Sequence, residues 1–252
     1  MNNSVTFSKL GSYGHLGNQL FQFSLLYSYS KVKNKNITFL NDNKNSMLFK
    51  CFDIKCDINF LDNIIINSTY TERKFSYDSE VWNKNVDNFI GYFQSEKYFK
   101  NNEELKNIFS FKTKSDALND HVFIHVRRGD YLKYPNIHPV CSEDYYSNSI
   151  DLIKNKYGSS VKFTVFSDNI IETQTYNCFK QNNIEFSNDS SFISLYKMTT
   201  CMSGIIANSS FSWWGAWLMV NINKTIIAPK NWFGSSGPKD TQDLYCSDWI
   251  VL

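Results

Sequence analysis

The chain has 252 residues, of which 42% are hydrophobic, so it can form the interior of one large domain or two small ones. Its 26 Lys and Arg residues nearly balance 24 Asp and Glu residues, giving a formal charge of +2. Nucleic-acid binding, which needs a dense cationic face, is therefore not expected. No segment approaches the ~18 consecutive apolar residues of a spanning helix, and residues 1–6 show no leader pattern, so we predict a cytoplasmic protein.

The N-terminal half begins with alternating strands and helices. Its expected elements are a strand at 5–8, a helix at 18–33, strands at 37–40 and 89–93, and a helix at 103–108. The segment from 41 to 88 shows no regular pattern. The polar residues 112–120 suit a linker.

The C-terminal half has the clearer periodicity. Val122, Ile124 and Val126 occupy every second position, which is typical of a strand. Apolar residues recur at helical spacing from Ser142 to Tyr157, where Gly158 acts as a stop. The further expected elements are strands at 161–166, 184–186, 203–207 and 225–228, a polar helix at 170–181, a helix opening near 190 and a buried helix at 211–220.

Strands that alternate with helices over about 130 residues indicate a parallel α/β sheet, with ligands at the carboxyl ends of the strands. We therefore predict two Rossmann-like halves. The first is an N-terminal domain of residues 1–115, and the second is a C-terminal domain of residues 116–252.

Four segments fall where this architecture binds ligands. The first, residues 14–19 (GHLGNQ), joins the first strand to the first helix. Its glycines would let backbone N–H groups approach an anion, and the helix N-terminus would add a favourable dipole. A tight turn with Asn18 as the helix cap explains the same residues without a ligand.

The second segment, residues 125–130 (HVRRGD), ends a predicted strand. His125 and Arg127 are two positions apart, so they project from one face of that strand. Paired arginines at a buried strand end indicate an Arg fork on phosphate, oriented by Asp130. The structural alternative is an ion pair between Asp130 and Arg128.

The third and fourth segments follow later strands. Asp168 ends a strand, where a carboxylate can accept two N–H bonds from a guanine edge or simply cap the next helix. Residues 207–217 place serines at a helix start, which suits phosphate. For Trp213, Trp214 and Trp217, packing of the helix against the sheet is the preferred interpretation.

Several motifs are absent from the sequence. It has no GxxxxGK[ST] loop, GxSxG elbow, HExxH or Asp-x-Asp, and its six cysteines are scattered without a CxxC pair. Phosphate handling by arginines and a helix dipole, with no metal and no cofactor, is typical of transferases with a nucleoside-diphosphate leaving group.

Together the segments 125–131 (HVRRGDY), 17–22 (GNQLFQ) and 208–218 (NSSFSWWGAWL) closely resemble the bacterial and viral α-1,2-fucosyltransferases of glycosyltransferase family 11. Segments 92–99, 166–168 and 228–233 are also similar to that family. The resemblance implies a GT-B-like fold, with two parallel sheets facing across a cleft. It also implies GDP-L-fucose as donor and metal-independent, inverting transfer to the 2-hydroxyl of a galactose-type acceptor glycan.

The resemblance also implies roles for single residues. Arg127 would bind the β-phosphate, with Arg128 and His125 contributing less directly to its charge stabilisation. Further donor contacts are implied for Gly17, Asn18, Asp168, Ser210 and Phe211.

Three residues remain as candidates for the base that takes the acceptor proton: Asp130, Glu96 and His15. His15 stands where the family commonly has Gly, and the chain is shorter than typical members. Two alternatives to a fucosyltransferase stay open, a transferase of another GDP-sugar and a non-catalytic glycan- or nucleotide-binding module. Peripheral contact with a membrane that carries a lipid-linked acceptor is compatible with either enzyme.

Overall fold

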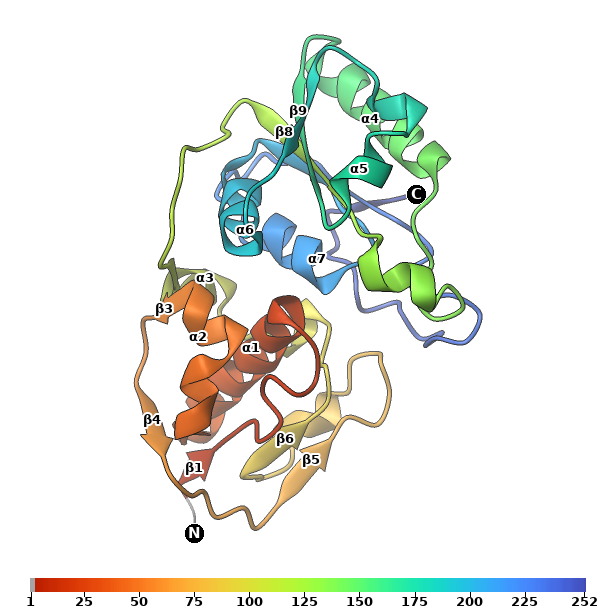
Figure 1. The fold of residues 1–252 in the computed structure, drawn as a ribbon. Helices are drawn as coiled ribbons and strands as arrows, with labels where there is room; N and C mark the ends of the chain where they lie inside the picture. Colours follow the sequence, from red (N-terminus) through yellow and green to blue (C-terminus); the bar gives the residue numbers. More distant parts are fainter. Residues whose placement is uncertain (1–2) are drawn as a thin grey trace. The chain divides into compact units, whose positions relative to one another are not determined.

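A computed structural model describes residues 3–252, and the chain divides into two compact units (Figure 1). Unit 1 comprises Met1–Lys112 together with Asp240–Cys246, and unit 2 comprises Thr113–Lys239 together with Ser247–Leu252. The division near 112 falls in the polar segment that the sequence indicates as a linker. The segment Asp240–Cys246, however, belongs to unit 1, although the predicted C-terminal domain contained it.

Unit 2 is built on six parallel strands in the order β10-β9-β8-β11-β12-β13. The strands are β8 (His121–Val126), β9 (Lys162–Ser167), β10 (Ile184–Ser187), β11 (Ser203–Ile205), β12 (Ile226–Ala228) and β13 (Ile250–Val251). Counted along this unit, the order is 3-2-1-4-5-6, which is the Rossmann arrangement. The direction of winding reverses between β8 and β11, so the carboxyl ends of these two strands flank the switch point, where such sheets bind ligands.

Helices cover both faces of this sheet (Figure 1). They are η4 (Gly129–Lys133), α4 (Glu143–Tyr157), α5 (Ile170–Thr173), η5 (Asn177–Phe179), α6 (Ser191–Thr200) and α7 (Ser210–Trp217). Val122, Ile124 and Val126 of β8 are fully buried in one core with residues of α4. The alternate residue His125 contacts Phe211 of α7, so α7 lies on the opposite face.

The predicted helix at 170–181 is wrong in its extent. Only α5 and the short η5 form there, and threonine hydroxyls share the carbonyls that the backbone N–H groups also use, which weakens a helix. The Thr173 hydroxyl donates to the Asn169 carbonyl at 2.7 Å, and the Thr175 hydroxyl donates to the Glu172 carbonyl at 2.7 Å.

Unit 1 also contains parallel strands. They are β1 (Ser4–Val5), β2 (Asn36–Leu40), β4 (Ile58–Leu61), β5 (Thr69–Thr71) and β6 (Asn88–Ile90). Strands β1, β2 and β4 form one sheet, and β5 pairs with β6. A parallel bridge between Thr6 and Asn88 joins the two sets, with Phe89 N donating to Thr6 O at 3.1 Å. The carboxyl ends of β1 and β6 therefore meet at one edge.

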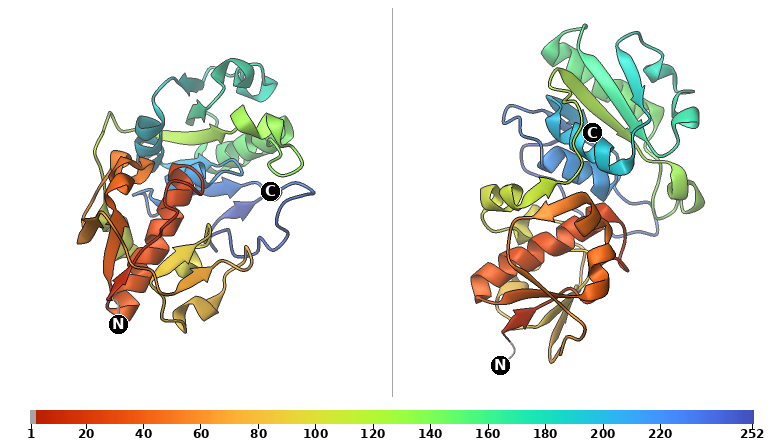
Figure 2. Two further views of the ribbon diagram at one scale, coloured as in Figure 1. Left: turned by 60° about the horizontal axis from the view of Figure 1, so that its bottom comes forward. Right: turned by 60° about the vertical axis from the view of Figure 1, so that its left-hand side comes forward.

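The remaining elements of unit 1 surround these strands (Figure 2). They are α1 (Leu16–Lys33), η1 (Asn41–Asn45), α2 (Met47–Cys51), η2 (Ser79–Trp82), η3 (Glu96–Tyr98), α3 (Asn102–Ile108) and the antiparallel pair of β3 (Phe52–Ile54) with β7 (Phe109–Phe111). Helix α1 is buried on nearly all sides, and its Phe23 ring lies 6.3 Å from that of Phe39 on β2. Aromatic packing of this kind fills the core of the unit.

The segment Asp240–Cys246 is fixed to unit 1 by its carboxylates. Asp240 accepts a hydrogen bond from Ser76 N at 2.8 Å, and Asp243 accepts one from Tyr77 N at 3.0 Å. Asp243 also pairs with Lys97. These contacts join residues more than 140 positions apart, which is why sequence periodicity gives no sign of them.

Candidate functional site

The site in unit 2 is centred on Arg127, the first residue after β8. Its Nη2 donates to Asp130 Oδ1 at 2.6 Å, and its Nη1 lies 2.8 Å from Asp168 Oδ2. The Tyr131 ring lies against the guanidinium, 5.3 Å from its centre. The side chain is 26% exposed, so the guanidinium is held in one orientation at the edge of the sheet while remaining accessible to a ligand.

Asp168 links the two arginines. Its Oδ1 accepts a hydrogen bond from the backbone N–H of Arg128 at 2.9 Å, while its Oδ2 faces Arg127. A Cβ on Gly129 would lie 2.4 Å from Asp168 Oδ2, so this close approach requires glycine. The turn after β8 is thereby tied to the end of the neighbouring strand β9.

Arg128 points away from this pair. Its guanidinium donates to the Tyr176 hydroxyl, lies 5.4 Å from the Tyr176 ring centre and is 3.7 Å from Glu172. The alternative interpretation from the sequence, an ion pair of Asp130 with Arg128, is therefore wrong about the partner, because Asp130 pairs with Arg127. The buried Nε of Arg128 has no hydrogen-bond partner among the described residues.

His125 is buried beneath the site and is only 5% exposed. Burial, and secondarily the nearby Arg127 charge, lower the pKa of its imidazole to about 3. The ring lies 5.5 Å from that of Phe211, and Nδ1 has no partner in the described part of the chain. At neutral pH His125 is therefore an uncharged group, and the positive charge of the site comes from the arginines.

The end of β11 meets the end of β8 through two residues that the sequence-based site omits. The Tyr131 hydroxyl donates to the Asn208 carbonyl at 3.0 Å, and the Asn208 amide donates to the carbonyls of Pro139 and Trp232 at 2.8 and 3.0 Å. Ser209 then caps α7 by accepting from Phe211 N. Tyr131 lies in the family-like segment 125–131 and Asn208 in the segment 208–218, so these motifs were the sequence signal that could have indicated both residues.

The N-terminus of α7 thus lies at the same sheet edge as Arg127. Ser210 and Phe211 begin this helix, and the partial positive charge of a helix N-terminus favours an anion. The predicted packing role of Trp213, Trp214 and Trp217 is confirmed, since they are 0%, 0% and 4% exposed. Unit 2 therefore brings together Arg127, Asp130, Asp168 and the start of α7.

Unit 1 holds the remaining predicted residues. His15 is exposed at the N-cap of α1 and makes no side-chain cap bond, so the helix begins before Asn18, which is not its cap. Gly17 is buried in the first turn, and the Asn18 side chain lies over Gly14, whose φ is +86°. Glu96 opens η3 and is half-buried.

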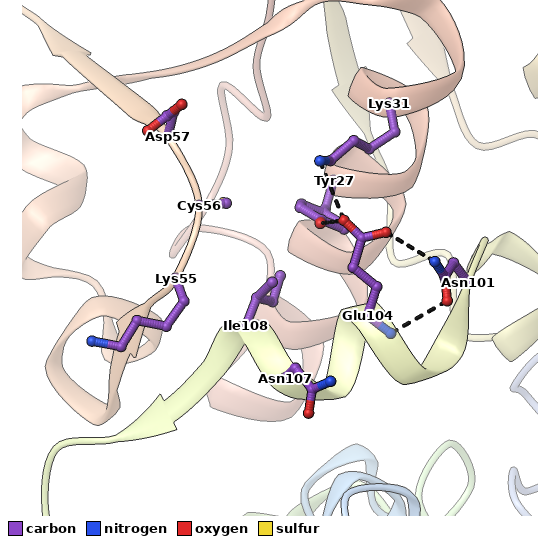
Figure 3. A pocket seen from close by; sticks show the side chains of 9 residues that line it. All are labelled: Tyr27, Lys31, Lys55, Cys56, Asp57, Asn101, Glu104, Asn107 and Ile108. Atoms are coloured by element: carbon purple, nitrogen blue, oxygen red, sulfur yellow. Dashed lines mark hydrogen bonds and ion pairs between the residues drawn. The ribbon is translucent and has the colours of Figure 1, made fainter.

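A hollow of about 750 Å³ also lies on unit 1 (Figure 3). It is lined by side chains of mixed charge, among them Lys31, Lys55, Asp57 and Glu104. Lys31 lies 3.2 Å from Glu104, and Lys55 pairs with Asp53. None of the predicted site residues lines this hollow.

Residues 3–252 contain no group of three or more His, Cys, Asp or Glu side chains placed to hold a metal ion. None of their helices has the length and apolar character needed to cross a membrane.

The fold is similar to that of solved fucosyltransferases. The NodZ α-1,6-fucosyltransferase from Bradyrhizobium, soaked with GDP-fucose, matches with a TM-score of 0.53 at 11% sequence identity. The match covers 87% of this chain and 93% of that one. The two α/β units therefore define a GT-B-like glycosyltransferase fold.

The sequence relatives identify the family. The profile of Glycosyl transferase family 11 matches residues 6–252. An α-1,2-colitosyltransferase from Escherichia coli is 33% identical, over 87% of this chain and 90% of its own. A Caenorhabditis elegans protein described as a candidate galactoside 2-α-L-fucosyltransferase is 26% identical, over 97% of this chain and 78% of its own length. The chain belongs to glycosyltransferase family 11, a fucosyltransferase family.

Proposed function

We propose that the protein transfers L-fucose from GDP-L-fucose to the 2-hydroxyl of a galactose-type acceptor glycan, with inversion and without a metal ion. The observation that carries the proposal is Arg127, an accessible guanidinium beside the α7 N-terminus at the switch point of a Rossmann sheet. Such a place suits the diphosphate of a nucleotide sugar. Membership of family 11 supports the activity.

In the proposed reaction the acceptor oxygen bonds to the anomeric carbon of fucose as the bond to the β-phosphate oxygen breaks. GDP leaves with the electron pair, and a base takes the acceptor proton. Arg127 stabilises the charge that develops on the β-phosphate, and one such preorganised donor is worth about 3–4 kcal/mol of barrier. Asp130 and Asp168 hold the guanidinium in place before the donor binds.

The other donor contacts are proposed from the family motifs. Asp168 would face the base or ribose, Ser210 and Phe211 would lie near the phosphates, and Gly17 and Asn18 would also contact the donor. His125 is proposed to shape the strand end as a neutral group. Asp130, Glu96 and His15 remain the candidate bases, and Asp130 is the one that contacts Arg127.

The test is incubation with GDP-fucose and a panel of β-galactosides, followed by assay of free GDP and determination of the product linkage. An α-1,2-fucosylated product supports the proposal. Release of GDP with a different linkage overturns the acceptor position. Binding of GDP-fucose without turnover indicates a non-catalytic module instead.

A second candidate donor is the GDP-activated form of colitose, favoured by the 33% identity to an α-1,2-colitosyltransferase. Colitose is the 3-deoxy counterpart of fucose. A site that hydrogen-bonds the 3-hydroxyl rejects the deoxy sugar strongly, whereas an apolar site discriminates weakly. The ratio of kcat/KM for the two donors with one acceptor decides which sugar the enzyme uses.

Action in the cytoplasm on a lipid-linked glycan is also part of the proposal. Cell fractionation tests it, with the native protein expected in the cytosolic fraction or loosely bound to membranes. Recovery from the culture medium contradicts it.

A further inference from the structure

In unit 1, buried side chains tie the loop after β1 to the loop after β6. Gln22, which is 0% exposed, donates from Nε2 to the carbonyls of Tyr13 at 3.1 Å and Gly91 at 3.0 Å. One carbonyl of each loop therefore accepts a hydrogen bond from the side-chain amide of Gln22. These two bonds satisfy the buried N–H₂ group of Gln22.

The loop after β6 has an unusual backbone that a carboxylate holds. Glu72, just beyond β5, accepts hydrogen bonds from Tyr92 N at 2.7 Å and Phe93 N at 2.8 Å. Gly91 has φ of +150°, and Phe93 adopts a left-handed φ of 53°. A non-glycine residue in this region is disfavoured, so the carboxylate compensates for a conformation that the chain would otherwise leave.

This conformation brings Gln94 to Asn18. Gln94 is 8% exposed, and its Nε2 donates to Asn18 Oδ1 at 2.7 Å. The Asn18 oxygen is thus already used, and the amide nitrogen is the end that remains. Within residues 3–252 that nitrogen donates no hydrogen bond, and it lies over Gly14, where a Cβ would come within 1.9 Å of it.

We propose that Gln94 is a positioning residue of the transfer reaction, which orients Asn18 so that its N–H₂ group faces an acceptor atom of the bound nucleotide sugar. The inference rests on the proposed function, in which Asn18 contacts the donor. An amide that presents N–H groups suits a phosphate or hydroxyl oxygen, whereas the opposite orientation would present an oxygen to an anion.

The central test is a double-mutant cycle on GDP affinity, measured by calorimetry with the full-length protein. Asn18→Ala removes the proposed contact, and we expect the Kd for GDP to rise at least about tenfold. Gln94→Met releases the Asn18 amide, and we expect a rise of several-fold. If Gln94 acts through Asn18, the double variant binds GDP no more weakly than Asn18→Ala alone.

Two substitutions test the orientation itself. Asn18→Asp keeps the oxygen that Gln94 holds but removes the N–H₂ group, so it should weaken GDP binding at least as much as Asn18→Ala. Gln94→Glu can no longer donate to the Asn18 oxygen and accepts from its nitrogen instead, which turns the oxygen toward the donor. Gln242→Met is the matched control, because Gln242 is exposed in the same unit, and its Kd should equal that of the wild type.

The outcomes separate this inference from the proposed function. Additive losses in the cycle, or an Asn18→Asp variant with normal affinity, overturn the positioning role even if fucose is transferred. A wild-type protein that binds GDP but transfers no fucose overturns the proposed function, while the cycle still measures the coupling. A wild-type protein that binds no GDP overturns both. Thermal midpoints of every variant identify any loss that comes from unfolding.

Discussion

Arg127 faces two carboxylates, and this arrangement defines its chemistry. Both guanidinium edges are used, one by Asp130 and one by Asp168, yet the side chain is 26% exposed. A phosphate that binds Arg127 therefore displaces a carboxylate, because both terminal nitrogens of the guanidinium already pair with aspartates. Fixed geometry is therefore as important here as charge.

The substitution Arg127→Lys separates geometry from charge. Lysine keeps the positive charge but loses the planar pair of donors, so we expect kcat/KM to fall at least about 100-fold, mainly through kcat. The thermal midpoint should change little, because partly exposed ion pairs contribute about 0–1 kcal/mol. Steady-state kinetics and thermal unfolding on the same protein check both expectations.

Arg73→Lys is the matched control for this substitution. Arg73 also pairs with an aspartate, Asp78, but it lies in unit 1 and is 60% exposed. Its replacement should leave turnover unchanged. Normal turnover in soluble Arg127→Lys protein contradicts the role of Arg127, and a lower melting temperature with normal turnover indicates a structural ion pair.

Because His125 is buried and uncharged, we expect it to make the free energy of unfolding depend on pH. Its imidazole takes up a proton near pH 6.5 in the unfolded chain, but in the folded chain its pKa is lowered to about 3 by burial and the Arg127 charge. Between these values the unfolded chain binds more protons, so the free energy of unfolding falls as the pH is lowered below 6.5. In His125→Phe this decline should be smaller, by up to about 1.4 kcal/mol per pH unit.

Urea unfolding at several values between pH 7 and pH 5 measures this slope. A change at the exposed His15, such as His15→Gln, serves as the control. Equal slopes in the wild type and His125→Phe contradict the buried neutral state of His125.

At the scale of elements, Glu72, which follows β5, holds the loop after β6 through hydrogen bonds from its backbone. Burial raises the pKa of this carboxyl to about 7, although hydrogen bonds from Tyr92 N and Phe93 N act in the opposite direction. The folded chain therefore holds a proton that the unfolded chain releases near pH 4.5, and the free energy of unfolding falls as the pH rises from 4.5 through 7. This is opposite in sign to the contribution of His125.

We expect Glu72→Gln to be less stable than the wild type near pH 8, because one backbone N–H loses its acceptor. Its stability should also fall less steeply between pH 4.5 and 7, by at most about 1.4 kcal/mol per pH unit. Denaturant titrations at each pH measure both effects, with Glu80→Gln at an exposed position as the control. An unchanged slope shows that Glu72 is ionised throughout this range.

At the scale of the whole molecule, the proposed chemistry relies on the electrostatics of arginine and of a helix terminus. We therefore expect transferase activity to persist in excess EDTA. The check is to compare turnover before and after chelation and dialysis, with a manganese-dependent glycosyltransferase assayed in parallel as the positive control for the chelator. Complete loss of activity that manganese or magnesium restores contradicts the arginine-based mechanism.

Local patterns in the sequence predict much of unit 2. Alternating apolar residues identified β8 and β9, and helical spacing together with Ser142 and Gly158 gave α4 within a residue. These signals are local, because a buried strand or helix leaves its period in the chain whatever lies opposite it. The motifs likewise gave the family, which the match over residues 6–252 confirms.

Which side chains meet depends on how the chain folds in three dimensions. The pairing of Asp168 with Arg127, the contact of Gln94 with Asn18 and the attachment of Asp240 to Ser76 join residues 41, 76 and 164 positions apart. No period in the sequence encodes such contacts. The order of the strands sets the first two, since parallel strands distant in sequence end at one edge of a sheet and bring their loops together there, whereas the carboxylate of Asp240 sets the third.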